Sequence, residues 1–269
     1  MKRAAIFLLL STAVSAEELS PAIQDNSFLV EEAYNQEPGV VQHIQSFTRT
    51  WNRDEWIYTF TQEWPVPGIT HQLSYTLAYQ RAGMTERPAD TALNYRYQLA
   101  GNGEAKVACA PRLSLILPTG DEKAGTGSGS VGVQALLPLS IVLGEKWGSH
   151  SNVGGTIVPS ARNAAGDKAT TRSVNLGQSF IWLANPRFNI LLESVWSRNE
   201  SVAGPGRAAH QESFLVSPGV RWAYNFKSGL QIVPGVAFPF GVGPSRGQKS
   251  FLLYLSFESP VWTARSTTR

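Results

Sequence analysis

The sequence predicts an all-β protein folded as a single antiparallel, up-and-down transmembrane β-barrel of about 12 strands. Three observations favour this class. Polar and apolar residues alternate with a period of two along most of the chain, short and long connections alternate between these stretches, and helical periodicity is missing after the first residues. A soluble β-sandwich would give the same alternation of faces but no alternation of connection lengths.

The N-terminus has the pattern of a signal peptide covering residues 1–16. Met1-Lys2-Arg3 is basic, residues 4–10 are apolar, and residues 13–16 are small enough for cleavage after Ala16. The apolar run is far shorter than the ~20 residues that a spanning helix requires. We therefore expect an exported protein in which residues 17–39 form a periplasmic or luminal segment ahead of the barrel.

Composition argues against several classes of partner and cofactor. Without Lys2 and Arg3, 21 of the 23 basic residues remain against 20 acidic ones, a net charge of +1, so nucleic acid is not an expected partner. Cys109 is the only cysteine, which excludes an intramolecular disulfide, and the 4 histidines have no close ligand spacing. We expect no metal and no cofactor.

The candidate strands are separated by clusters of Gly, Pro, Asn, Asp and Ser. They cover residues 40–51, 56–64, 70–80, 91–100, 105–117, 130–143, 147–159, 171–183, 187–198, 212–225, 230–240 and 249–258. The barrel is therefore predicted to span residues 40–258, and residues 259–269 are predicted to form a polar C-terminal tail.

The connections alternate in length along the chain. Tight turns are expected at residues 65–69, 101–104, 144–146, 184–186 and 227–229. Longer connections, rich in glycine and charge, are expected between them, as at residues 81–90, 118–129 and 199–211. Short turns at one rim and long loops at the other, with an even number of strands, are typical of bacterial outer-membrane barrels.

The faces of the strands indicate which side meets lipid. In the second strand Trp56 and Trp64 share a face and lie eight steps of ~3.3 Å apart, which at a ~40° tilt is ~20 Å of height, close to the spacing of two aromatic girdles. In the third strand Leu73, Tyr75 and Leu77 alternate with Ser74 and Thr76. We predict that the Leu73 face meets lipid and the Ser74 face meets the lumen.

Charged residues fall on the inferred inner face, at Glu63, Arg96, Arg112, Glu193 and Arg221. A water-containing barrel interior tolerates such charges, whereas a soluble core would not unless they were paired. They either brace the lumen or line a path for a solute. Ahead of the first strand, Glu31, Glu32 and Glu37 suggest a hypothesis in which this segment folds inward, pairs with luminal arginines and partly plugs the pore.

Two motifs resemble chemical sites. Residues 127–132 fit the dinucleotide pattern G-x-G-x-x-G, but they lead into a strand rather than a helix, so we expect a flexible outer loop. Ser140, His150 and Asn152 are the residue types of the catalytic set of outer-membrane phospholipase A. Nothing in the sequence shows that Ser140 reaches His150, and a locally hydrogen-bonded histidine is the expected alternative.

Four stretches resemble a known family: Pro111–Asp121, Val131–Leu143, Trp147–Gly154 and Gly229–Pro239. Together they are similar to the outer-membrane barrels of the MetA-pathway of phenol degradation family, described as transporters. The resemblance implies a Gram-negative outer-membrane protein that moves small hydrophobic or aromatic molecules. It does not indicate which residues of this chain would bind them. One departure is that the chain continues past Phe257 to Arg269, whereas such barrels usually finish on an aromatic residue.

These observations lead to a functional expectation. We expect an outer-membrane channel or transporter that is not an enzyme, with membrane lipids and an unidentified small solute as its partners. Two alternatives stay open. One is a structural or adhesive barrel whose outer loops bind a partner, and the other is an outer-membrane lipid hydrolase.

Overall fold

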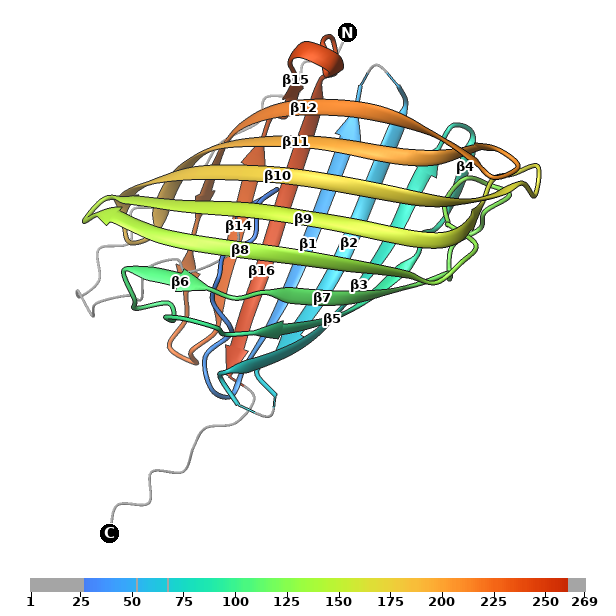
Figure 1. Cartoon of the computed structure of the whole chain (residues 1–269). Coiled ribbons are helices and arrows are strands. Elements are labelled where there is room, and N and C mark those ends of the chain that lie inside the picture. The colour runs from blue at the N-terminus through green and yellow to red at the C-terminus, as the bar shows by residue number, and fades with distance from the viewer. Residues whose placement is uncertain (1–26, 52, 67, 261–269) are drawn as a thin grey trace, which may run out of the picture.

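The computed structural model describes residues 27–51, 53–66 and 68–260. The predicted signal peptide and residues 261–269 of the predicted tail lie outside the described residues, whereas Ser259 and Pro260 of that tail belong to the last strand. The described chain forms a closed antiparallel β-barrel of 12 strands, which confirms the predicted fold class (Figure 1). Among these residues no helix is long and apolar enough to cross a membrane.

The barrel is built from strands and one short 3₁₀ helix. In chain order they are β1 (Val40–Thr50), β2 (Glu55–Trp64), β3 (His71–Ala82), β4 (Thr85–Pro88), β5 (Thr91–Tyr97), β6 (Val107–Cys109), β7 (Arg112–Leu117), β8 (Gly132–Gly144), β9 (Trp147–Arg162), β10 (Lys168–Asn185), β11 (Phe188–Gly204), β12 (Arg207–Trp222), β13 (Tyr224–Asn225), β14 (Gln231–Ala237), β15 (Phe240–Gly241), η1 (Gly243–Ser245) and β16 (Ser250–Pro260).

Several of these are pieces of one barrel strand. β6 and β7 form a single strand interrupted at Pro111, and β14 and β15 form another interrupted at Pro239. Proline has no N–H to give to a neighbouring strand, so the ladder breaks at both places. β13 continues β12 after Ala223, and β4 extends the hairpin that begins with β3.

The barrel closes between the first and the last strand. β1 pairs with β16 along its whole length, from Val40 opposite Pro260 to Thr50 opposite Ser250. β14 pairs with β16 on one side and with β12 on the other, although only three residue pairs join it to β12. Closure satisfies the main-chain groups that the edge of an open sheet would expose.

The predicted outer loops at residues 81–90 and 199–211 are in fact hairpins that extend strands. β11 reaches Gly204 and β12 starts at Arg207, so the expected loop at residues 199–211 is a hairpin with a tight turn. β10, with 18 residues, is the longest strand described. At ~3.3 Å per residue and ~40° tilt it rises ~45 Å, well beyond an apolar band of ~25 Å. Outside that band both faces of a hairpin meet water, so the sequence there loses its alternation.

The outward and inward faces are as predicted. Leu73 and Leu253 are 44% and 49% exposed on the outside of the barrel, whereas Ser74 is 8% exposed on the inside. The neighbouring strands follow the same rule, since Leu93 and Leu113 are exposed and Asn94 is buried. The barrel therefore has an apolar outer surface and a polar interior. Inside it lies the extended chain of residues 27–39, here called the N-terminal segment (Figure 1).

Candidate functional site

The N-terminal segment is held in the barrel by bonds from wall side chains to its main chain. The N–H groups of Leu29 and Val30 donate to Oε1 of Glu193, at 2.9 and 3.1 Å. Asn152 on β9 makes two bonds with Glu31, accepting its N–H at 2.8 Å and donating to its carbonyl at 2.9 Å. An extended segment without a strand partner needs such acceptors and donors, because buried main-chain groups are costly when unpaired.

The same pattern continues to the end of the segment. The further main-chain bonds are Ala33 N–H to Ser140 Oγ (2.8 Å), Arg96 Nη1 to Tyr34 O (2.8 Å), Gln98 Nε2 to Ala33 O (2.7 Å), Asn35 N–H to Gln98 Oε1 (2.9 Å) and Gln36 N–H to Gln72 Oε1 (2.8 Å). These wall residues come from strands all along the chain, so the segment crosses the interior from β11 to β3.

A phenylalanine anchors the start of the segment. A Cβ atom added to Gly219 of β12 or Gly235 of β14 would lie 2.6 Å and 2.5 Å from ring carbons of Phe28, so the ring fills a notch between these glycines. The Phe28 ring also lies 5.2 Å from the ring of Tyr254, centroid to centroid. Ser27 adds a hydroxyl contact of 2.8 Å to Ser179.

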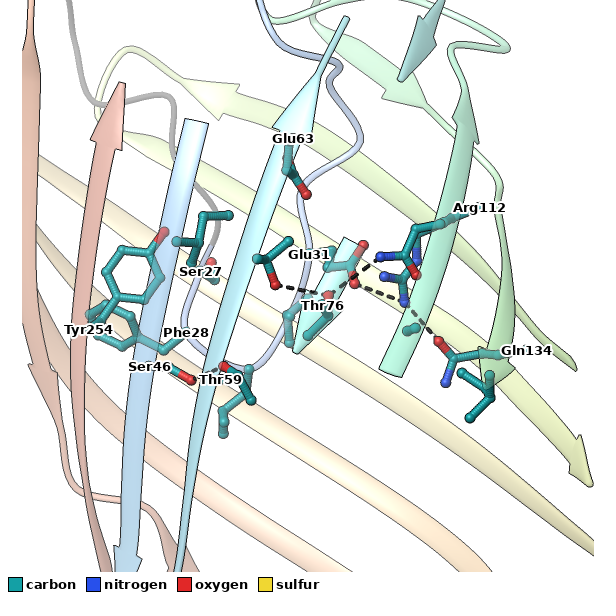
Figure 2. Close-up of a pocket in the computed structure, with 17 residues that line it drawn as sticks. Ser27, Phe28, Glu31, Ser46, Thr59, Glu63, Thr76, Arg112, Gln134 and Tyr254 are labelled. Carbon is teal, nitrogen blue, oxygen red and sulfur yellow. Dashed lines mark hydrogen bonds and ion pairs between the residues drawn. The ribbon is translucent and has the colours of Figure 1, made fainter. Parts of the chain in front are cut away.

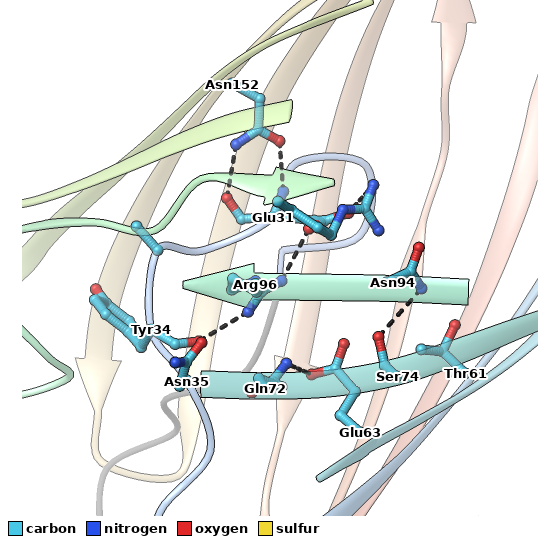
Figure 3. A network of polar contacts seen from close by, with 12 residues as sticks. Glu31, Tyr34, Asn35, Thr61, Glu63, Gln72, Ser74, Asn94, Arg96 and Asn152 are labelled. Carbon is cyan, nitrogen blue, oxygen red and sulfur yellow. Dashed lines mark hydrogen bonds and ion pairs between the residues drawn. The ribbon is translucent and has the colours of Figure 1, made fainter. Parts of the chain in front are cut away.

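The charged part of the site is centred on Glu31. Its carboxylate is 2.9 Å from Arg96 Nη2 (Figure 3). It is also 3.1 Å from Arg112 Nη2, and Arg112 donates to Gln134 at 2.8 Å (Figure 2). Arg96 is almost fully buried, with 3% of its side chain exposed. A buried guanidinium is tolerated where a carboxylate and further acceptors surround it. One carboxylate of the segment therefore pairs with two arginines of the wall.

The five charged residues predicted for the inner face all lie there, in different surroundings. Arg96 and Arg112 meet at Glu31, Glu193 binds the main chain of the segment, and Glu63 accepts a bond of 2.7 Å from Gln72. Arg221 is buried on β12, with 1% exposed. Whether any of them lines a path for a solute stays a prediction.

The three acids proposed for a plug lie in different surroundings. Glu31 forms the ion pairs described above, and Glu32 is buried with 1% exposed. Glu37 is exposed in the turn before β1. The geometry of Glu31 fits the proposed plug, whereas the side chain of Glu37 lies at the surface.

Sequence reasoning missed the uncharged residues that hold the segment. The sequence gives no reason to single out Gln72 and Gln98, and it indicates Ser140 and Asn152 only as residue types of a catalytic set. All four lie on the inner side of the wall, where the sequence shows an ordinary polar face. A polar face is expected in any water-containing barrel, so the pattern gives no signal for which side chains bind a segment from elsewhere.

The structure does bring Ser140 and His150 together. Ser140 Oγ lies 2.7 Å from His150 Nδ1, and the two side chains are buried at 1% and 6% exposed. The ring of Tyr34 lies edge-on to His150, with centroids 5.9 Å apart. Asn152 does not complete a catalytic set, because its amide is bonded to the main chain of Glu31. The pair is therefore covered by the N-terminal segment.

A cavity of about 330 Å³ lies beside the segment (Figure 2). One part of its lining is apolar and aromatic, with Phe28, Ile44 and Tyr254, and another part is polar. The polar residues that line it are Ser27, Ser46, Thr59, Thr61, Thr76, Asn94 and Gln134, together with Glu31, Glu63 and Arg112. A space of this size and mixed lining is large enough for a small organic molecule.

The described residues contain no group of three or more His, Cys, Asp or Glu side chains that could hold a metal ion. Residues 127–132, which fit the dinucleotide pattern, lie in the connection between β7 and β8 and lead into a strand. The helix N-terminus that this pattern needs for phosphate binding is not present at that place.

Comparisons with known proteins show similarity in structure alone. No protein-family model matches the chain, and no curated protein matches its sequence. An outer-membrane channel from Pseudomonas putida F1 has a similar structure, with a TM-score of 0.56 and 17% identity over 84% of this chain and 97% of that one.

Two porins have a similar structure as well. NanC porin gives a TM-score of 0.52 at 6% identity, and KdgM porin gives 0.51 at 10% identity. Each match covers 80% of this chain and 98% of the porin. At these identities the likeness establishes the fold, and the function has to be argued from the residues of this chain.

Proposed function

We propose that the chain is an outer-membrane channel for small organic molecules whose lumen is narrowed by its own N-terminal segment. The observation that carries the proposal is the combination of an apolar outer surface with a polar interior that retains a cavity of about 330 Å³. A soluble protein would bury the apolar side chains, whereas lipid is the natural surrounding of exposed Leu73 and Leu253. Similarity in fold to outer-membrane channels and porins supports the same location.

The mixed lining of the cavity supports a solute that has both an apolar and a polar part. Phe28, Ile44 and Tyr254 suit an aromatic or aliphatic body, and the hydroxyl groups around Thr59 suit a polar group. This agrees with the small hydrophobic or aromatic molecules implied by the resemblance to the MetA-pathway of phenol degradation family. Membership in that family is part of the proposal.

The test is single-channel recording in planar bilayers, comparing the full chain with a variant that lacks residues 17–38. Removal of the segment takes away the chain that crosses the interior, so the conductance is expected to rise. The matched control is Glu37→Gln, which changes one exposed residue of the same segment and is expected to leave the conductance unchanged. If neither protein gives current steps, the proposed channel is contradicted. If deletion of the segment leaves the conductance unchanged, the proposed plug is contradicted.

A second candidate function is adhesion through the outer hairpins. The long strands β10, β11 and β12 carry the barrel wall beyond the height of an apolar band, which gives a partner a structured surface to bind. Shortening the β11–β12 hairpin by removing residues 200–210 separates the two functions. A channel keeps its conductance after this change, whereas an adhesive barrel loses attachment of cells to a surface or to a partner cell.

A further inference from the structure

The outer surface of the barrel has a groove of about 570 Å³ at the rim where β1 begins and β2 ends. Gln42 and Glu63 are buried on the inner side of these strands. Side chains alternate along a strand, so their neighbours His43, Gln62 and Trp64 lie on the outward side, and all three line the groove. The groove is therefore continuous with the apolar surface that meets lipid.

This rim is the one that carries the short turns. β1 starts there at Val40, β2 and β3 are joined there by residues 65–70, and β16 ends there at Pro260. In bacterial outer-membrane barrels the short turns face the periplasm, and an aromatic girdle marks the edge of the apolar band. Trp64 is the aromatic residue of that girdle on β2. The groove therefore lies at the height of the periplasmic leaflet, which consists of phospholipids.

The walls of the groove are apolar. They include Val40, Val41, Val66 and Ile69, of which Val66 and Ile69 are 45% and 49% exposed. Apolar side chains at the edge of the bilayer are stabilised when hydrocarbon replaces the water around them. An acyl chain that fills the groove would cover these side chains.

Two N–H donors of the groove have no acceptor among the described residues. Gln62 Nε2 lies 2.8 Å from His43 Nε2, and Gln62 Oε1 accepts from the hydroxyl of Tyr75 at 2.9 Å. An amide nitrogen only donates, so Nε2 of the neutral His43 ring accepts and its proton lies on Nδ1, free to donate. Trp64 packs on Tyr75 with ring centroids 5.5 Å apart, and its indole N–H is the second donor. Both donors suit a ligand that offers oxygen acceptors.

We propose that this groove binds one glycerophospholipid of the periplasmic leaflet. An acyl chain lies against the apolar walls, and ester or phosphate oxygens of the lipid accept hydrogen bonds from His43 and Trp64. The ester and phosphate oxygens of a phospholipid are acceptors, so they match two donors that the protein leaves unpaired. The inference rests on the outer-membrane location in the proposed function, and it adds a lipid site on the outside of the barrel.

The test is native mass spectrometry of the full chain in detergent micelles to which dioleoylphosphatidylethanolamine is added stepwise. A specific site gives one bound lipid at low lipid content, before further lipids add in a graded series. Trp64→Phe keeps an aromatic ring and removes the N–H, and His43→Leu removes the other donor. Loss of one hydrogen bond should weaken binding of the first lipid roughly 2- to 10-fold, and the double variant should bind more weakly than either single variant.

Trp56→Phe is the matched control. Trp56 lies on the outward side of the same strand, at the other girdle and outside the groove, so this variant should bind the first lipid as the full chain does. Equal binding in all variants, or a graded series without a distinct first lipid, would overturn the site. A dimer that carries no lipid would also overturn it, and would assign the groove to contact with a second copy of the chain.

Single-channel recording separates this inference from the proposed channel. The groove lies outside the barrel, so Trp64→Phe and His43→Leu should leave the conductance unchanged. A distinct first lipid in a protein that gives no current steps would support the lipid site and contradict the channel. Current steps in a protein without a distinct first lipid would contradict the lipid site and leave the channel intact.

Discussion

The close packing of Phe28 against two glycines leads to a prediction whose magnitude can be estimated from the structure. A Cβ atom on Gly235 would lie 2.5 Å from Cε1 and Cζ of the Phe28 ring and 3.2 Å from Cβ of Arg221. Carbon atoms pack at about 3.5–4.0 Å, so in Gly235→Ala the ring has to withdraw by about 1 Å. Overpacking of this kind costs about 1–3 kcal/mol, which corresponds to a roughly 5- to 150-fold larger population with the N-terminal segment undocked.

The assay is the labelling rate of a cysteine placed in the segment. Ser27 is 3% exposed, so Ser27→Cys, in a chain whose single native cysteine is removed by Cys109→Ala, reacts with a soluble maleimide only when the segment undocks. Gly235→Ala is expected to raise the rate by the factor given above. Gly148→Ala is the matched control, because a Cβ at Gly148 would meet no atom within 4 Å.

A double-mutant cycle tests the cause. In the Phe28→Ala background the clash is gone, so Gly235→Ala should no longer raise the rate, and the two changes should be strongly non-additive. Alanine in a strand is more stable than glycine by about 0.5–1 kcal/mol. The effect of Gly235→Ala on β14 alone would therefore stabilise the barrel and would not raise the labelling rate. An equal rise with and without the Phe28 ring would refute the steric reasoning, as would no rise at all.

Three further predictions follow from the same contacts. Glu193→Leu leaves the N–H groups of Leu29 and Val30 unpaired, which should lower the free energy of unfolding by about 1–3 kcal/mol for each group. Glu193→Gln keeps a carbonyl oxygen that accepts these bonds. Urea titration of the folded barrel in lipid vesicles should therefore give a lower unfolding midpoint for the leucine variant than for the glutamine variant. Leu77 lies on the outer face opposite Phe60, midway between Trp56 and Trp64, so Leu77→Arg should cost about 2–4 kcal/mol in the same titration, with Leu77→Ala as the smaller reference change. Ser140 and His150 are covered by the segment, so phospholipid in mixed micelles should not be hydrolysed; an activity that Ser140→Ala abolishes would favour the lipid hydrolase instead.

The fold could be predicted because each barrel strand has its own local signal. Leu73 alternates with Ser74, and Leu253 with neighbours that turn inward, so the side of each strand follows from the period of two. Prolines and glycines mark the turns for equally local reasons. One limit of this reasoning is the hairpin around residues 199–211, where both faces meet water and the alternation is lost. Another is the interruption of predicted strands at Pro111 and Pro239, which have no N–H to pair.

The candidate site could be predicted only in part. The sequence placed Arg96, Arg112 and Glu193 on the inner face, and it suggested that the acids near Glu31 fold inward. It did not indicate that Glu31 would pair with both arginines while Glu37 stays at the surface. The N-terminal segment has no periodicity, so no pattern fixes which of its residues meets which side of the wall.

The sequence by itself determined the strands, the direction of their faces and the polar character of the interior, because these depend on neighbours within a few residues along the chain. Only the tertiary structure decided that Phe28 fits between Gly219 and Gly235, and that one carboxylate bridges two strands. Such contacts join residues far apart in sequence across a closed barrel. Their distances depend on the registers of all the strands between them, which no local pattern contains.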